Sequence, residues 1–450
     1  MPREKADPVS GILIAAPSSN SGKTVVTLAL LRALTRQGHK IAAAKTGPDY
    51  IDPAFQAAAC RGTCINLDPW AMGRKQVASL VTGHATGKSF VMCEGVMGLF
   101  DGAANGEGST ADLAAQTGWP VVLVVDVKGQ SASAAALISG FANFRKDINV
   151  AAVILNRVGS SRHAKMIIDA CARHLPDLPI IGAVRRSDEL TLPERHLGLV
   201  QAGEHPKLDA FLERAADIIA EDVDLDALTG LAELTKPSDP QDGDAGNLDD
   251  APLIAPLGQR IAVARDQAFA FCYPHILDGW RRAGASVTFF SPLANEAPDP
   301  ECDAIYLPGG YPELHASTLA AADIFKAGMH EVAARDVLIY GECGGYMTLG
   351  TDLTDADGTT HQMLGLLPLS TSFATRRLHL GYREAKIGIP TPFGPAGMTV
   401  RGHEFHYATT LSEDGIPFCR MRTALGGDLG PAGLVQGRVF GSFFHVIAQS

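Results

Sequence analysis

The sequence predicts an α/β protein built from two units, each with a mostly parallel sheet. Three observations predict it. Short, nearly continuous apolar runs such as residues 121–125 alternate with helical stretches, which is typical of parallel strands covered on both faces. A phosphate-binding loop sequence, residues 17–24, lies between an apolar run and a long helical stretch. An acid-rich segment within residues 221–250 separates this pattern from a second one.

The first unit is predicted to be doubly wound, with its ligands at the carboxyl ends of its strands. A helix over residues 25–37, closed by Gly38, follows the phosphate-binding loop. Strands are expected at residues 12–15, 41–45, 90–93, 121–127, 150–155 and 180–184.

The second unit begins after a segment whose low hydrophobicity and one-sided charge cannot bury enough surface to fold alone. We therefore predict a linker over residues 233–258, between domains over residues 10–232 and 259–450. Strands of the second domain are expected at residues 261–264, 287–290, 304–307, 337–340 and 439–443.

Composition excludes several classes of protein. The formal net charge of −11 argues against nucleic-acid binding, which needs clustered Lys and Arg. No apolar run approaches the roughly 20 residues of a membrane helix, and the start of the chain carries no signal-peptide core. Eight scattered cysteines favour a reducing compartment, and we expect the cytoplasm.

The phosphate-binding loop ends in Ser21, Gly22, Lys23 and Thr24. Glycine lets backbone N–H groups approach phosphate oxygens, lysine reaches the β- and γ-phosphates, and the threonine hydroxyl binds Mg²⁺. Pro17 replaces the usual first glycine, so the loop is a variant. The alternative is a simple strand-to-helix turn with an exposed lysine.

Two further segments, residues 45–53 and 94–102, follow the second and third predicted strands and would lie at the same edge. Carboxylates there can hold Mg²⁺ against phosphates, and a lysine can neutralise a substrate carboxylate or a migrating phosphoryl group. The alternative is that these acids are turn residues beside proline and glycine. The predicted metal ligands are Thr24, Asp49 and Glu94, and the predicted substrate or phosphoryl residues are Lys45, Asp49, Tyr50, Asp52 and Asp101.

A second reactive centre is predicted at Cys343. Gly341-x-Cys343-x-Gly345 provides the small residues that a sharp strand–nucleophile–helix turn requires. His445, at the end of a later strand, is the predicted base, with His403 and His406 as competitors. The N–H groups of Gly344 and of the Gly310 turn are predicted to form an oxyanion hole. The alternative is an inert buried cysteine.

These segments, together with residues 307–314 and 402–407, resemble the cobyrinic acid and hydrogenobyrinic acid a,c-diamide synthases of vitamin B12 biosynthesis. The resemblance covers residues 11–232 and 259–450. It implies a P-loop, doubly wound ATP-binding domain similar to dethiobiotin synthetase, followed by a class I glutamine amidotransferase-like domain. Asn156 looks like the adenine-reading residue of that fold.

The resemblance implies a reaction with two halves. Cys343 attacks the side-chain amide of glutamine, His445 raises its nucleophilicity, and the released ammonia amidates the a and c acetate groups of the corrin ring through acyl phosphates formed from ATP with Mg²⁺. Class I enzymes usually place a Glu two residues after the histidine, where this chain has Ile447. We predict Glu404 as the orienting residue instead.

Alternatives stay open at this point. Two alternatives, cobyric acid synthase and nickel-sirohydrochlorin a,c-diamide synthase, differ from the leading hypothesis, a cobyrinic or hydrogenobyrinic acid a,c-diamide synthase, only in their substrate. A partition-type P-loop ATPase switch with an inactive amidotransferase-like domain is the rival from another class. Pairs Arg185-Arg186 and Arg376-Arg377 are candidates to hold the polycarboxylate corrin, or are solvated surface residues. A homodimer is one expectation for the oligomeric state.

Overall fold

The computed structural model describes residues 9–192, 194–195, 198–199, 201–233 and 253–449. The chain divides into two compact units, with the division along the chain between Asp249 and Asp250. Most of the predicted linker lies outside the described residues. Leu253 and Ile254, at its far end, are buried: Trp280 donates its indole N–H to Ile254 O, and Gln449 N donates to Leu253 O.

The first unit is built on a sheet that contains seven parallel strands in its described part, in the order β3-β2-β4-β1-β5-β6-β7. The strands are β1 Gly11–Ala15, β2 Ile41–Thr46, β3 Cys64–Leu67, β4 Phe90–Glu94, β5 Val121–Asp126, β6 Val150–Val158 and β7 Ile180–Arg185, and a short hairpin pairs β8 Glu194–Arg195 with β9 Gly198–Leu199. The predicted doubly wound sheet is confirmed. Within this sheet β3, a short edge strand, was not predicted, and neither was the β8–β9 hairpin.

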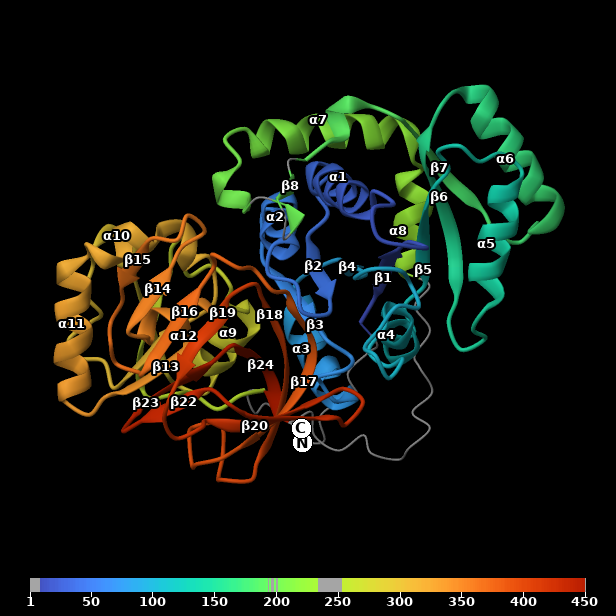
Figure 1. The fold of residues 1–450 in the computed structure, drawn as a ribbon. Coiled ribbons are helices and arrows are strands. Elements are labelled where there is room, and N and C mark those ends of the chain that lie inside the picture. The colour runs from blue at the N-terminus through green and yellow to red at the C-terminus, as the bar shows by residue number, and fades with distance from the viewer. Residues whose placement is uncertain (1–8, 193, 196–197, 200, 234–252, 450) are drawn as a thin grey trace. The chain divides into compact units, whose positions relative to one another are not determined.

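Helices cover both faces of this sheet, as Figure 1 shows. They are α1 Lys23–Arg36, α2 Asp52–Cys60, α3 Arg74–Ala85, α4 Thr110–Thr117, α5 Ser133–Asn143, α6 Ser161–His174, α7 Leu208–Asp222 and α8 Leu225–Glu233. One face packs against α1, α2, α7 and α8, where Ile12 and Ile14 of β1 join Leu28, Phe55 and Leu212 in one core. Burial on both faces explains why the strand sequences are apolar throughout.

The second unit contains a six-stranded sheet among its described residues, in the order β11-β10-β12-β13-β23-β22, in which the β22–β23 pair alone is antiparallel. Its strands are β10 Arg260–Ala264, β11 Ser286–Phe290, β12 Ala304–Leu307, β13 Leu338–Glu342, β22 Leu434–Gln436 and β23 Val439–Ser442. Its helices are α9 Pro274–Arg282, α10 Ala316–Ala320, α11 Asp323–Ala334 and α12 Gly344–Leu349.

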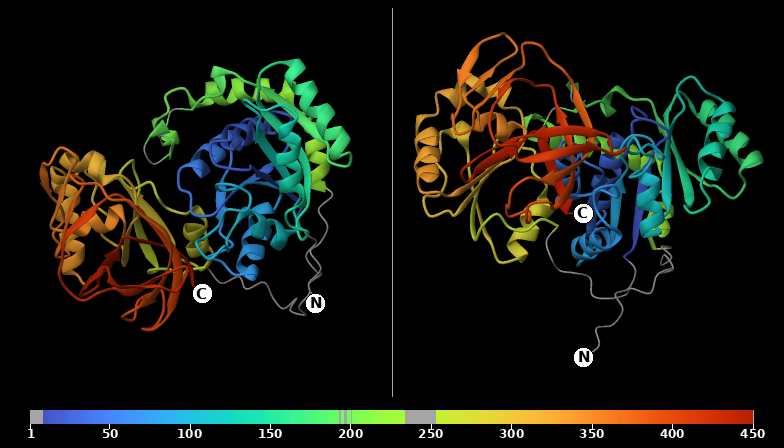
Figure 2. Two further views of the ribbon diagram at one scale, coloured as in Figure 1. Left: turned by 45° about the vertical axis from the view of Figure 1, so that its right-hand side comes forward. Right: turned by 60° about the horizontal axis from the view of Figure 1, so that its bottom comes forward.

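Two more sheets complete the second unit, and the sequence did not predict them. A five-stranded antiparallel sheet has the order β21-β20-β17-β18-β24, and a four-stranded sheet the order β15-β14-β16-β19, within the described part of the unit. Their strands are β14 Asp352–Thr354, β15 Thr360–Gln362, β16 Leu369–Ser372, β17 His379–Ile387, β18 Thr399–His406, β19 Thr409–Glu413, β20 Cys419–Thr423, β21 Asp428–Ala432 and β24 Phe444–Gln449. Figure 2 shows these strands in orange and red.

Aromatic side chains pack the connection between β17 and β18 of the five-stranded sheet against the parallel strands. The Tyr340 ring on β13 lies 4.8 Å from Phe393 in an edge-to-face contact and 4.9 Å from Phe440 on β23. Such ring pairs add stability beyond the area they bury. The packing brings β18 and β24, which carry His403 and His445, beside the end of β13.

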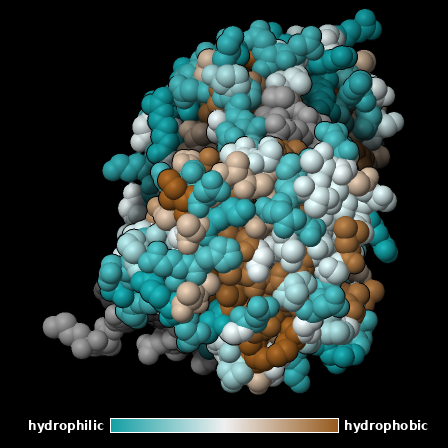
Figure 3. Space-filling model, turned by 60° about the vertical axis from the view of Figure 1, so that its left-hand side comes forward, coloured by the Kyte–Doolittle hydropathy of each residue, from teal (hydrophilic) through white to brown (hydrophobic). Residues whose placement is uncertain are grey.

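The described residues contain no helix that is both long and apolar enough to cross a membrane. The face of the molecule in Figure 3 is mostly hydrophilic, with its hydrophobic side chains in separate small groups.

The start of β1 provides a test of packing in the first unit. A Cβ added at Gly11 would lie 2.4 Å from Trp119 Cε2, and this indole is buried and donates its N–H to Val9 O at 2.9 Å. We expect Gly11→Ala to lower the free energy of unfolding by about 1–3 kcal/mol because an overpacked core must shift. Urea denaturation followed by circular dichroism measures the effect.

Gly140→Ala is the matched control for this measurement. Gly140 lies inside α5 with open space around its Cα, so alanine should leave stability unchanged or raise it by up to ~1 kcal/mol. Equal stability of the two variants would show that Trp119 moves aside without cost.

Candidate functional sites

The phosphate-binding loop connects β1 to α1 through a tight turn. Gly22 has φ of +79°, and a Cβ there would lie 2.3 Å from Asn156 Nδ2, so both the backbone angle and the close approach require glycine. Pro17 stands beside the segment after β4: a Cβ on Gly98 would lie 2.6 Å from Pro17 O. The Ser21 hydroxyl donates to Ser18 O at 2.9 Å and closes the loop on itself.

Asn156 and its neighbour hold the far side of this loop. Asn156, on β6, donates from Nδ2 to Ser21 O at 2.8 Å. Arg157 donates from Nη1 to Asn20 O at 2.8 Å and to Asp126 Oδ2 at 2.7 Å. No sequence pattern predicted this role for Arg157. Its positive φ of +58° turns the chain directly after Asn156, a strain that no sequence pattern reveals.

A buried ion cluster lies next to the loop, centred on Glu94 at the end of β4. Glu94 is fully buried, and its Oε1 lies 2.7 Å from Thr24 Oγ1, 3.0 Å from Lys45 Nζ and 3.3 Å from Lys23 Nζ. Gln56, on α2, donates from Nε2 to Glu94 Oε2 at 2.5 Å. Gln56 was also missed, because a single glutamine on a helix carries no motif.

Lys45, at the end of β2, is the second charged centre of this cluster. Its Nζ lies 2.5 Å from Asp52 Oδ2 and 3.7 Å from Asp49 Oδ2. Burial lowers the pKa of Lys45, but the carboxylates of Asp52, Glu94 and Asp49 outweigh it and hold that pKa well above its usual value. For Lys23, burial and the positive charge of Lys45 together lower the pKa.

The predicted acids lie in different positions. Asp52 approaches the loop, with Oδ2 3.3 Å from Thr24 Oγ1, and burial raises its pKa. Asp49 accepts from the N–H groups of Ile51 and Asp52 and so forms the turn before α2. Tyr50 is half-buried in the same turn.

Asp101 is exposed, and its Oδ2 accepts from Gly98 N at 2.9 Å, which is the turn role considered above.

The ion cluster carries one net formal negative charge, because it contains the carboxylates of Glu94, Asp49 and Asp52 and the ammonium groups of Lys23 and Lys45. The described residues show no group of three or more His, Cys, Asp or Glu side chains able to enclose a metal by themselves. Mg²⁺ commonly needs only one or two carboxylates, with phosphates and water completing its shell. The hard oxygens of Thr24, Glu94 and Asp52 fit that requirement.

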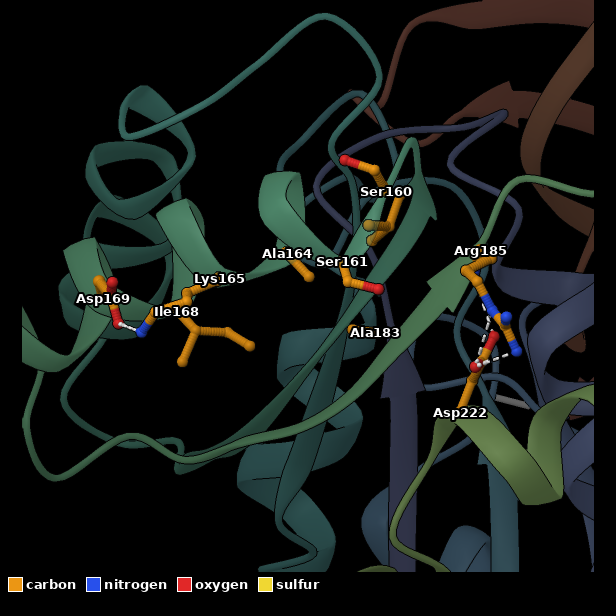
Figure 4. Close-up of a pocket in the computed structure, with 10 residues that line it drawn as sticks. Ser160, Ser161, Ala164, Lys165, Ile168, Asp169, Ala183, Arg185 and Asp222 are labelled. Carbon is orange, nitrogen blue, oxygen red and sulfur yellow. Dashed lines mark hydrogen bonds and ion pairs between the residues drawn. The ribbon is translucent and has the colours of Figure 1, made fainter.

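A separate cavity of about 330 Å³ opens beyond the ends of β6 and β7, between Ser160 at the start of α6 and Arg185 (Figure 4). Arg185 turns toward Asp222, with 3.2 Å between Nη2 and Oδ1, and its Nη2 lies 3.5 Å from Glu221 Oε2. Two carboxylates therefore already compensate its charge, which weakens its candidacy as a ligand for a carboxylate substrate.

In the second unit, Cys343 occupies a strained turn between β13 and α12. Its φ is +47° and its ψ −103°, a conformation that non-glycine residues rarely adopt. The glycines on either side make the turn possible: a Cβ on Gly345 would lie 1.9 Å from Leu307 O, and one on Gly341 would lie 2.6 Å from Leu349 Cδ1. The small residues that suggested a nucleophile turn have this steric reason.

Cys343 and His445 come together at Gly309, in the turn after β12. A Cβ on Gly309 would lie 2.5 Å from His445 Cε1 and 3.3 Å from Cys343 Cβ. A Cβ on Gly344 would lie 2.9 Å from Gly310 N, so the two backbone segments predicted to form the oxyanion hole run side by side.

The Cys343–His445 pair is neutral in this state. Burial, aided by the nearby carboxyl of Glu313, raises the pKa of the Cys343 thiol, and burial lowers the pKa of His445 well below its usual value. A thiolate–imidazolium pair therefore needs a bound substrate or a nearby counter-charge.

The competing histidines and the predicted orienting acid lie around His445. The His403 ring stacks on His445 at 4.9 Å, whereas His406 stacks on Phe443 at 3.9 Å. Strand pairing sets Glu404 opposite Phe444 and His403 opposite His445, so Glu404 points to the other face of the sheet.

Glu404 instead pairs with Arg383 at 2.6 Å. The structure therefore does not bring Glu404 to His445. The carboxylate that faces His445 Nδ1 is Glu342, at 3.8 Å, which the sequence analysis missed.

The two units correspond to two known families. Residues 12–200 match the CobQ/CobB/MinD/ParA nucleotide-binding domain, and residues 260–450 match the CobB/CobQ-like glutamine amidotransferase domain. The fold and sites thus define a ligase that uses ATP and hydrolyses glutamine.

Close relatives span the whole chain. It is 54% identical over 442 residues to hydrogenobyrinate a,c-diamide synthase of Brucella anthropi, which covers 98% of both chains. Identity to the enzyme of the same name from Sinorhizobium sp is 53% over 440 residues, or 98% of this chain and 99% of the relative. The chain belongs to the hydrogenobyrinate a,c-diamide synthase family, as the sequence analysis predicted.

Proposed function

We propose that this enzyme amidates the a and c acetate carboxylates of hydrogenobyrinate, the cobalt-free corrin acid, with ammonia from glutamine. The observation that carries the proposal is identity of 52–54% over nearly the full length of several relatives bearing that name. The name favours this substrate over those of cobyric acid synthase and nickel-sirohydrochlorin a,c-diamide synthase. We further propose that the enzyme works in the cytoplasm, where ATP and glutamine are available, and as a homodimer.

We propose that the second unit releases ammonia through Cys343. His445 takes the thiol proton, sulfur bonds to the side-chain carbonyl carbon of glutamine, and the C–N bond breaks as ammonia leaves with that proton. Water then cleaves the thioester to give glutamate. The Gly310 and Gly344 N–H groups would stabilise the oxyanion, which is supported by the close approach of these two segments.

We propose that the first unit activates the corrin carboxylate. Carboxylate oxygen attacks the γ-phosphorus of ATP, ADP leaves, and ammonia displaces phosphate from the acyl phosphate to form the amide. Ser21, Gly22, Lys23 and Thr24 would bind the phosphates, with Asn156 beside the adenine. Activation is needed because a free carboxylate has no good leaving group.

Lys45 would neutralise charge on the transferred phosphoryl group, since its pKa stays well above neutral pH. Asp49, Tyr50, Asp52 and Asp101 would contact the substrate segment. Thr24 and Glu94, with Asp49 or Asp52, would hold Mg²⁺, which supplies charge neutralisation at the phosphates when bound. The Asp52 position is supported by its 3.3 Å approach to Thr24.

The choice of ring substrate is tested by product analysis. We expect mass spectrometry to show two amidations of hydrogenobyrinate in the presence of ATP, Mg²⁺ and glutamine, and slower conversion of the cobalt-bearing ring. Equal or faster conversion of the cobalt form would contradict the assignment of the cobalt-free substrate.

The separation of the two half-reactions is tested at Cys343. We expect Cys343→Ala to abolish glutamine-dependent amidation, because no other group replaces the sulfur, while free ammonia still supports amidation at a rate near wild type. Amide product and glutamate are quantified with each nitrogen source. Unchanged glutamine-dependent amidation by Cys343→Ala would remove Cys343 from the glutaminase site, whereas no amide product even from the wild-type enzyme would favour the alternative of a nucleotide switch with an inert cysteine.

The Mg²⁺ and phosphoryl site is tested at Glu94. Glu94→Gln removes the negative charge that Thr24, Lys23 and Lys45 all contact. We therefore expect ammonia-dependent amidation to fall on the order of 100-fold or more. Glutaminase turnover by the second unit should persist, and urea denaturation followed by circular dichroism shows whether the first unit is folded. Glu107→Gln, an exposed acid between β4 and α4, is the matched control. Near-normal amidation by Glu94→Gln would remove Glu94 from the metal site.

A further inference from the structure

Glu342 is a buried acid directly before the nucleophile, and the chemistry proposed above does not use it. It is 3% exposed, at the end of β13. Its Oε1 accepts from Tyr340 OH at 2.7 Å and from Val446 N at 3.1 Å, and its Oε2 accepts from Tyr306 OH at 2.7 Å. The basic group facing it is His445, whose Nδ1 lies 3.8 Å from Oε2.

This environment holds a carboxylate that can change its charge near neutral pH. Burial raises the pKa of Glu342 to about 7, while the two tyrosine hydroxyls and the Val446 N–H oppose that rise by stabilising the charged form. Three neutral groups donate hydrogen bonds to Glu342, and no cation is hydrogen-bonded to it. Burying a carboxylate in this way costs stability, and an apolar side chain would fill the same space without that cost, so a purely structural role does not explain the acid.

The geometry couples Glu342 to both the backbone and the ring of the predicted base. Val446 directly follows His445, so its N–H bond to Glu342 fixes the strand that carries the histidine. Because Nδ1 faces Glu342, Nε2 is the nitrogen available to Cys343. The 3.8 Å separation exceeds a hydrogen bond, but catalytic contacts are often long in unliganded enzymes and tighten when substrate binds.

Other acids are less well placed for this task. Ile447 occupies the position two residues after the histidine and is buried and apolar. Glu404 lies on the opposite face of β18 and is paired with Arg383. Burial, and to a smaller extent His403, lowers the pKa of His445 well below its usual value, so proton transfer from Cys343 requires a counter-charge near the imidazole ring.

We propose that Glu342 is the positioning carboxylate of the Cys343–His445 pair. It orients the ring through Nδ1–H and compensates the imidazolium formed when the Cys343 proton moves to Nε2. The proton leaves again with ammonia, so Glu342 stays ionised through the cycle. This role rests on the glutaminase chemistry proposed for Cys343 and His445.

Glu342→Gln tests the proposal because it keeps the size of the side chain and removes its charge. We expect kcat for glutamine hydrolysis to fall at least about tenfold, and up to about 10⁴-fold by analogy with removal of the carboxylate from a Ser–His–Asp triad. KM for glutamine should change by less than about threefold, because Glu342 does not touch the substrate. Ammonia-dependent amidation, which the first unit carries out, should stay at the wild-type rate, and urea denaturation followed by circular dichroism reports whether the second unit is intact.

The pH profile separates a positioning role from a structural one. Wild-type kcat/KM for glutamine should fall as pH drops through about 7, where Glu342 takes up a proton. In Glu342→Gln this limb should be absent. The titratable groups facing this acid, Cys343 and His445 from neighbouring elements are Cys272, Tyr306, Tyr340, His403 and Glu313. Burial lowers the pKa of His403 to about 3 and raises the pKa of the Cys272 thiol and of the two phenols, so none of these four groups titrates near 7. Burial also raises the pKa of Glu313, whose charge acts on Cys343, to about 7, so Glu313→Gln is measured alongside: it should keep the wild-type limb, and loss of the limb there would assign it to Glu313 instead.

Two further variants sharpen the test. Tyr306→Phe removes a donor to Oε2, which raises the Glu342 pKa, so the acid limb should move upward by about one pH unit. This variant also serves if Glu342→Gln fails to fold. Glu404→Gln, the matched control on the other face of β18, should keep the wild-type limb.

Each outcome has a distinct meaning. An acid limb that stays in place in Glu342→Gln, or in Tyr306→Phe if the first variant does not fold, would overturn the positioning role. If Cys343→Ala retained glutaminase turnover, the proposed function of the whole site would fail. A dead Cys343→Ala together with a wild-type Glu342→Gln would overturn this inference and leave the proposed function intact.

Discussion

Parallel strand pairing is the constraint on which both sites depend. In a parallel sheet all carboxyl ends lie at one edge, so loops that are distant in sequence become neighbours. In the first unit β1, β2 and β4 deliver the phosphate-binding loop, Lys45 and Glu94 to that edge. In the second, the register sets Leu307 opposite Gly341, so β12 and β13 end level and their loops touch. Glycine at 309, 310, 344 and 345 is the steric condition for that contact.

The two units treat buried charge in opposite ways. In the first, Glu94 and Lys45 are buried with their ion-pair partners, so the phosphates that we propose to bind there would meet charges that are already oriented. In the second, burial keeps both Cys343 and His445 neutral. This difference suits the chemistry. Phosphoryl transfer needs cations that are charged before the substrate binds. A cysteine that was always a thiolate would undergo side reactions before glutamine binds.

Features with a local sequence pattern were predictable, whereas features that depend on which strands pair with each other were not. The apolar parallel strands and the glycine-flanked turn at Cys343 were predictable because each has a local pattern. The five-stranded antiparallel sheet was not, since β17, His379–Ile387, is half exposed and carries His, Arg, Glu and Lys along with its few apolar residues. The same sheet decides which acid faces His445. Glu404 looked suitable in sequence, but the pairing of β18 with β24 turns it away.

Glu342 shows that some pairing can nevertheless be recognised in sequence. Alternate residues of a strand share a face, so Tyr340 and Glu342 point the same way, and the register sets Tyr306 of β12 opposite Tyr340. A polar side chain at every second position of an otherwise apolar, fully buried strand has to be satisfied within the core. The strained turn at Cys343 then separates two consecutive side chains. The strand directs Glu342 inward, and the positive φ of the next residue sets the Cys343 side chain beside Gly309, where an added Cβ would lie 3.3 Å from Cys343 Cβ. The strain at Cys343 thus allows one strand end to carry both the sulfur and a carboxylate that faces His445, the base that we propose for it.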